Sequence, residues 1–197
     1  EVYYYARHST RDEVVNVFDR IVNAAKGAAL GTGTTMEYEM IGGTHELLHN
    51  EILQQLVHKN LEKIGGYAYT SEEKVFAEKI SESLGVSLNT QYVEGVEPYD
   101  NGGKAGGSTD VGDVSFAVPT VGLRAATWVP GTPAHSWQAV AAGGTDIGNK
   151  GMMVAAKTLA LTAMQLIDNP KIISEAKKEF LQKRGADFKY VPMLGDR

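Results

Sequence analysis

Apolar residues recur at helical spacing along most of the chain, and the stretches that carry them are bounded by residues that start or stop helices. Side chains three or four positions apart line one face of an α-helix, which predicts amphipathic helices packed on a core. Thr70-Ser71-Glu72-Glu73 is a capping box, so one helix begins there, and Gly65 and Gly85 end helices. The predicted helices carry the apolar sets Val14, Phe18, Ile21, Val22 and Ala25; Ile52, Leu53, Leu56, Val57, Leu61 and Ile64; Val75, Phe76, Ile80 and Leu84; Met152, Ala156, Leu159, Ala163 and Ile167; and Ile172, Ile173, Ala176 and Phe180.

Other segments favour β-structure. Residues 1–8 are aromatic, residues 34–41 follow a glycine-rich stretch, and residues 119–128 are rich in Val, Thr, Leu and Trp with proline at both ends. We expect 119–128 to be a buried strand between helices of an α/β core. The strand–helix–strand unit over 1–41 is an incomplete layer and should form a separate lobe. Residues 86–104 are irregular and polar, which predicts a mobile loop beside the site.

Composition narrows the class of protein. Hydrophobic residues make up 43% and charged residues 22% of the 197 residues, as in ordinary globular proteins. The formal charge of −5 argues against a nucleic-acid or anionic-membrane surface, and no apolar run approaches the roughly 20 residues that span a bilayer. The chain has no cysteine, which excludes disulfides and thiolate metal sites. We expect a cytoplasmic protein that binds neither nucleic acid nor membrane.

The candidate chemistry is concentrated in residues 106–137, which read GGSTDVGDVSFAVPTVGLRAATWVPGTPAHSW. Backbone N–H groups at Gly106 and Gly107, with the hydroxyls of Ser108 and Thr109, can hold a substrate carboxylate or simply form a tight turn. His135 lies on a Gly/Pro turn after the predicted strand, where site residues are often placed. Lys104 is not a P-loop lysine, because Ala105 stands where Ser or Thr is required.

The GGSTDVGDVSF element, followed by PGTPAHSW and a long glycine-opened helix, resembles the C-terminal part of the M20 metallopeptidases and amidohydrolases, in particular their aminobenzoyl-glutamate utilisation protein B branch. The resemblance covers nearly the whole chain. It implies part of a zinc-peptidase-like α/β catalytic domain over residues 47–197. It also implies the second half of a small α+β dimerisation (lid) domain over residues 1–46.

The resemblance also implies roles for individual residues. The family's late histidine, a ligand to one ion of a two-metal zinc or manganese centre, corresponds to His135, and Asp110 or Asp113 would hold its second ring nitrogen. Arg7 corresponds to an arginine of the family's lid, and Asn50 lies where the chain enters the catalytic domain. Both are candidate substrate contacts, although Arg7 is equally an exposed arginine at the end of a strand and Asn50 is placed to cap a helix. The expected substrate-binding set is Gly106, Gly107, Ser108, Thr109, Asp110, Asn50 and Arg7.

Motifs that the family needs elsewhere are absent from this sequence. There is no early His-x-Asp element and no paired-glutamate motif, so the general base and the other metal ligands are not in this chain and no catalytic residue is assigned. We expect a C-terminal fragment, inactive alone, of an amidohydrolase that cleaves an N-acyl amino acid or a p-aminobenzoyl-glutamate-like amide. Its partner would be an identical chain paired through the lid or a related second subunit. The alternative is a non-catalytic dimerisation module derived from the same fold.

Overall fold

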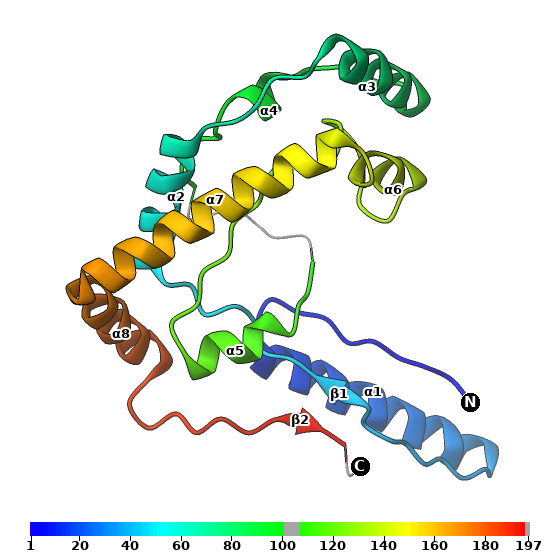
Figure 1. Ribbon diagram of the computed structural model, residues 1–197. Helices are drawn as coiled ribbons and strands as arrows, with labels where there is room; N and C mark the ends of the chain where they lie inside the picture. The colour runs from blue at the N-terminus through cyan, green and yellow to red at the C-terminus, as the bar shows by residue number, and fades with distance from the viewer. Residues whose placement is uncertain (101–106, 196–197) are drawn as a thin grey trace. The chain divides into compact units, whose positions relative to one another are not determined.

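The computed structural model describes residues 1–100 and 107–195. This part of the chain is mostly helical and contains a small two-stranded sheet (Figure 1). Its elements are α1 (Arg11–Thr32), β1 (Gly42–Gly43), α2 (Glu51–Ile64), α3 (Ser71–Leu84), α4 (Gln91–Glu94), α5 (Val111–Ala117), α6 (Trp137–Gly143), α7 (Asp146–Asp168), α8 (Pro170–Arg184) and β2 (Met193–Leu194). None of the described helices is long and apolar enough to cross a bilayer.

The predicted helix boundaries are confirmed where local chemistry sets them. Asn50 caps α2, because its side-chain oxygen accepts a hydrogen bond from the N–H of Leu53 at 3.1 Å. Thr70 and Glu73 form both bonds of the capping box at the start of α3. That helix ends at Gly85, whose φ of 69° is the left-handed conformation that glycine adopts without a steric penalty. These interactions lie within a few residues of one another, so the sequence alone specifies them.

The predicted strands are wrong for the described residues. Residues 1–8, 34–41 and 119–128 form no strand, and β-structure is limited to the antiparallel pairing of β1 with β2. The α/β expectation is therefore corrected to a mostly helical structure, which remains compatible with a piece of an α/β fold. A strand needs a neighbour for its backbone N–H and C=O groups, and β propensity does not replace that neighbour.

Three short helices were not expected from the sequence. The long helix expected after His135 is confirmed as α7 (Asp146–Asp168), and a short helix that we did not expect, α6, precedes it. The predicted loop over 86–104 contains the short helix α4, and its residues 101–104 lie outside the described residues. A further helix, α5, lies within the 106–137 motif, where we expected only a turn and an apolar strand.

The chain divides into two compact units, each of which we describe by itself. The first holds the described residues within Glu1–His49, Lys104–Thr120 and Phe180–Arg197, and the second those within Asn50–Gly103 and Val121–Glu179. The first unit thus contains α1, α5 and the β1–β2 pair, in which Gly42 faces Leu194 and Gly43 faces Met193. The boundary at residue 46 between lid and catalytic domain stays a prediction.

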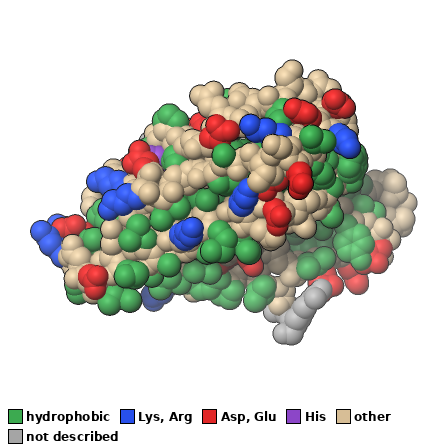
Figure 2. Space-filling view, turned by 45° about the horizontal axis from the view of Figure 1, so that its top comes forward, with side chains coloured by type: hydrophobic (Ala, Val, Ile, Leu, Met, Phe, Trp, Pro, Cys, Tyr) green, Lys and Arg blue, Asp and Glu red, His purple; other side chains and the backbone are tan. Residues whose placement is uncertain are grey.

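The core of the second unit forms where α3, α6 and the start of α7 meet. It consists of Tyr69, Ala77, Ile80, Val93, Val129, Ala142 and Ile147. Lys150 of α7 donates to the carboxylate of Glu73 on α3 at 2.7 Å, which ties the two helices together. Further along, α2 lies against α7 (Figure 1). Many apolar side chains nevertheless stay exposed, and Figure 2 shows them in bands between the charged groups.

Candidate functional site

The structure brings together two of the residues expected to bind substrate, both in the first unit. Nη1 of Arg7 donates a hydrogen bond to Oγ of Ser108 at 2.5 Å, and both side chains are exposed. Arg7 lies near the end of the 1–8 segment and Ser108 precedes α5, so the hydrogen bond joins residues that are far apart in sequence. A guanidinium has five N–H donors, and those not used by Ser108 remain suited to a carboxylate.

The hydroxyl residues after Gly107 form the turn into α5. Oγ1 of Thr109 accepts from the N–H of Val111 at 3.2 Å, and Asp110 stands at the N-cap position without a side-chain capping bond. Gly107 and Asp110 are exposed, whereas Gly106 lies outside the described residues. The tight-turn role is therefore present, and carboxylate binding by the same residues stays a prediction.

His135 is held on an exposed loop of the second unit, immediately before α6. The next residue, Ser136, holds this loop in place. Its hydroxyl accepts a hydrogen bond from the N–H of Ala139 at 3.2 Å and donates one to the carbonyl of Pro133 at 2.7 Å. His135 itself has a φ of 60°, the only positive φ of a non-glycine residue in the described chain. The left-handed conformation costs an L-residue on the order of 1–2 kcal/mol. Residues held at such a cost are enriched at functional sites, although histidine adopts this conformation more readily than most residues.

The described residues do not by themselves fit a metal centre. No group of three or more His, Asp or Glu side chains among them is arranged to hold an ion. His135 can supply one nitrogen donor, whereas a catalytic zinc site takes three protein ligands. Of the two proposed carboxylate partners, Asp113 accepts a hydrogen bond from the hydroxyl of Tyr190 at 3.2 Å. The metal role of His135 stays a prediction.

Asn50 has the capping role that the sequence also allowed. Its side chain is 2% exposed, accepts from Leu53 and donates to the carbonyl of Ala176 on α8 at 2.8 Å. The carboxylate of Glu179 accepts from the next N–H, that of Glu51, at 2.7 Å. Asn50 thus joins the start of α2 to α8, and a contact with substrate stays a prediction.

Sequence analysis missed a buried histidine in the first unit. His45 is 7% exposed and stacks on Phe116 with ring centroids 4.3 Å apart. Arg11 donates to its Nε2, and because arginine cannot accept, that nitrogen carries no proton. Burial is the main cause that lowers the pKa of His45 below 6.5, and the positive charge of Arg11 is the second. The nearby carboxylates of Asp113, Glu46 and Asp12 act in the opposite direction but do not cancel this shift. Nothing in the sequence pairs these residues, because they come from separate segments.

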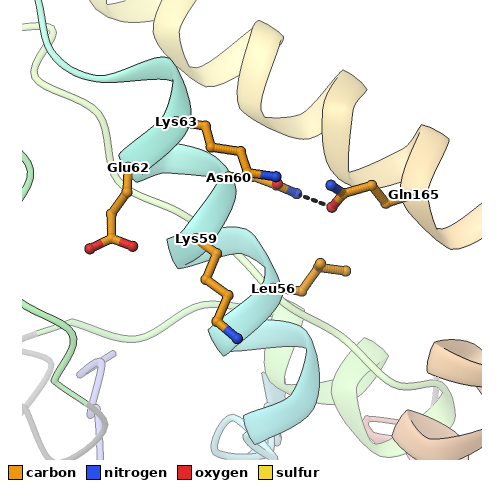
Figure 3. A pocket seen from close by; sticks show the side chains of 6 residues that line it. All are labelled: Leu56, Lys59, Asn60, Glu62, Lys63 and Gln165. Atoms are coloured by element: carbon orange, nitrogen blue, oxygen red, sulfur yellow. Dashed lines mark hydrogen bonds between the residues drawn. The ribbon is translucent and has the colours of Figure 1, made fainter.

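Two hollows lie in the second unit. One, of about 380 Å³, is lined by Leu56, Lys59, Asn60, Glu62, Lys63 and Gln165 (Figure 3). Its Asn60 donates to Gln165 at 2.8 Å and to Thr162 at 3.0 Å, and none of its lining residues belongs to the 106–137 motif. The other, a groove of about 390 Å³, is lined by α2 and by residues 65–67, 92–93, 95–100 and 122–126, with Val154 of α7. The groove therefore includes part of the motif.

Known proteins match this chain over most of its length. One subunit of the p-aminobenzoyl-glutamate hydrolase of Escherichia coli (strain K12) is 33% identical over 209 residues, which cover 92% of this chain and 43% of that protein. The Xaa-Arg dipeptidase of Mus musculus is 28% identical over 183 residues, 91% of this chain and 36% of that protein. The Xaa-Arg dipeptidase of Homo sapiens is 27% identical over 192 residues, 93% of this chain and 36% of that protein.

These homologues are hydrolases of amide or peptide bonds, and they confirm the resemblance drawn from the motifs. The identity is modest, and this chain spans less than half the length of each relative. No family model and no solved structure matches the chain.

Proposed function

We propose that this chain is the C-terminal part of a metal-dependent M20-type amidohydrolase that acts on an N-acyl amino acid or a p-aminobenzoyl-glutamate-like amide. The observation that carries the proposal is the 33% identity to the Escherichia coli p-aminobenzoyl-glutamate hydrolase over 92% of the chain. That match includes the PGTPAHSW turn, in which His135 adopts the left-handed conformation. The proposed cofactor is zinc or manganese.

The share of the reaction assigned to this chain is binding rather than bond cleavage. Arg7 and Ser108 would hold the substrate carboxylate, with a charge-assisted hydrogen bond from the guanidinium supplying most of the affinity. His135 would donate one imidazole nitrogen to the metal ion. Since the described residues do not complete a metal centre, the step at the scissile bond belongs to residues outside them.

The proposal is tested by combining this chain with the portion of the Escherichia coli relative that it does not match, produced as a separate polypeptide. The pair should hydrolyse p-aminobenzoyl-glutamate, whereas the isolated chain should show no turnover and no tight zinc binding by calorimetry. His135→Ala should lower kcat at least a hundredfold, and the exposed control His49→Ala should not. Nanomolar zinc binding with turnover by the isolated chain would contradict the proposal.

The role of Arg7 has its own readout. Arg7→Ala should raise KM for p-aminobenzoyl-glutamate by about tenfold or more, because a charged hydrogen bond contributes about 1.5–3 kcal/mol. It should leave KM for the same compound with its glutamate carboxylates amidated unchanged. Equal effects on both substrates would show that Arg7 does not bind the carboxylate.

A further inference from the structure

Segment 188–194 of the first unit is connected to α1 through one guanidinium group. Nη2 of Arg11, the first residue of α1, donates to the carbonyl of Val191 at 2.9 Å. Nη1 of the same group donates to Nε2 of His45. Because this nitrogen accepts only while it carries no proton, the neutral imidazole holds Arg11 in the orientation that reaches Val191.

The side chains of the segment pack on the same imidazole. The rings of Phe188 and Tyr190 lie with their centroids 5.8 and 5.9 Å from that of His45. The hydroxyl of Tyr190 also donates to the carboxylate of Asp113 on α5 at 3.2 Å. After these residues, β2 adds a two-residue pairing with β1. A segment that contains no helix and so short a strand opens locally at a lower free-energy cost than the packed helices of the unit do.

Groups of both charges face His45 from the elements packed around it. They are Arg11 and Asp12 of α1, Glu46 beside it in the chain and Asp113 of α5, with the ionisable hydroxyl of Tyr190 on the segment itself. Arg184 of α8 contacts the neighbouring ring, with its Cζ 5.6 Å from the centroid of Phe188. Burial and then Arg11 outweigh the carboxylates, so the pKa of His45 is lowered and the native contacts favour the neutral ring.

A proton on Nε2 weakens the hydrogen bonds from the segment to α1 and to α5. The ring no longer accepts from Arg11, and two cations then lie together where His45 is 7% exposed, so Arg11 moves away from Val191. The imidazolium becomes a donor instead, and among the carboxylates Asp113 acts on it most strongly. A bond from the imidazolium to Asp113 competes with the bond from Tyr190.

We propose that His45 is a pH-sensitive switch: protonation of its imidazole detaches segment 188–194, together with the pairing of β2 with β1, while α1 and α5 stay folded. In the detached state the ring returns to water and to its ordinary pKa of about 6.5, so that state binds the proton more tightly and acid favours it. The attached state is therefore fully stabilised above about pH 6.5 and is lost as the pH falls through the lowered pKa.

Detachment changes the surface of the first unit. Phe188 leaves Phe116, from which its ring centroid is 5.1 Å away, and β1 loses the strand that pairs with it. A weakly acidic medium thus uncovers an apolar ring and a strand edge. The switch needs no hydrolase activity, so the chain by itself is sufficient to test it.

The test is NMR relaxation of the full chain between pH 7.5 and pH 5. The backbone order parameters of 188–194 should be about 0.85 at pH 7.5, as in a rigid backbone, and should fall below about 0.6 at pH 5. Those of α1 and α5 should not change. The midpoint of the fall should coincide with the titration of the His45 ring, followed through its own proton signals in the same samples.

Two histidine variants identify the group responsible. His45→Gln keeps an acceptor for Arg11 and carries no charge at any pH, so the segment should stay ordered at pH 5. The exposed control His49→Gln should show the wild-type change. Order of the segment at pH 5 in the wild type, disorder at pH 7.5, or a change that persists in His45→Gln would overturn the switch.

Two further outcomes would also overturn it. A simultaneous loss of order in α1 would show general unfolding in place of local detachment. If His45→Gln does not fold, the wild-type chain still decides, because a midpoint that differs from the titration of the His45 ring excludes the switch.

Discussion

At the scale of single residues, the buried imidazole of His45 makes the stability of the protein depend on pH. The ring is held against Phe116, and its Nε2 accepts from Arg11. A proton on that nitrogen would remove the acceptor and set two cations side by side in a poorly solvated position. The native unit therefore holds His45 neutral, and its pKa lies below 6.5.

Because the pKa of His45 is lower in the folded state than in the unfolded state, the unfolded state binds more protons at acidic pH. Its contribution to stability is complete above about pH 6.5 and is lost as the pH falls through the folded-state pKa. We expect His45→Gln to flatten the decline in the free energy of unfolding between pH 7.5 and pH 5, measured by urea denaturation. The exposed His49→Gln is the control, and equal declines in the two variants would contradict this account.

At the scale of elements, the position of α7 depends on a glycine, because a side chain at residue 151 would collide with the neighbouring backbone. Gly151 lets the helix backbone meet Ala126, and Tyr67 binds the same carbonyl. Thr158 and Thr162 donate to carbonyls one turn earlier in α7, so their buried hydroxyls are satisfied within the helix. The helix can therefore bury threonines and glycines on the same face as the apolar Ile147.

Two glycine-to-alanine substitutions distinguish the effect of this close contact on stability from the effect of the higher helix propensity of alanine. Gly151→Ala should destabilise the protein by about 1–3 kcal/mol, because the added methyl overlaps Ala126 and the helix must shift. Gly27→Ala in α1 meets no atom within 4 Å and should stabilise by roughly 0.5–1 kcal/mol. Urea denaturation measures both changes, and effects of the same sign would refute the close contact.

At the scale of the whole molecule, the first unit exposes apolar side chains that a monomer would ordinarily cover. Val2, Tyr3, Tyr4 and Tyr5 are between 66% and 83% exposed, and the 1–8 segment has no strand partner among the described residues. We propose that this segment pairs with a second copy, because an exposed and unpaired apolar segment is a template for such pairing.

Sedimentation should therefore show a dimer at high micromolar concentration. Tyr5→Lys should weaken this association about tenfold or more, since it places a charge in the paired segment. Val75→Lys, an exposed substitution on α3 of the second unit, serves as the control. A clean monomer at that concentration would exclude the association.

The sequence by itself determined what short-range chemistry controls. The capping box at Thr70 and Glu73, the cap at Asn50 and the left-handed Gly85 each act within a few residues, so the helices they bound were predictable. The motif around His135 likewise indicated hydrolase relatives, because a motif is a local string of residues.

Only the tertiary structure decided what depends on distant neighbours. Whether 119–128 is a strand depends on a neighbouring strand for its backbone, and the described residues offer none. The side of α7 that is buried follows from the close contact at Gly151 and not from its hydrophobic pattern, which predicted burial of a neighbouring face about 100° round the helix. The environment of His45 comes from Arg11, Phe116 and Tyr190, residues that only folding brings together.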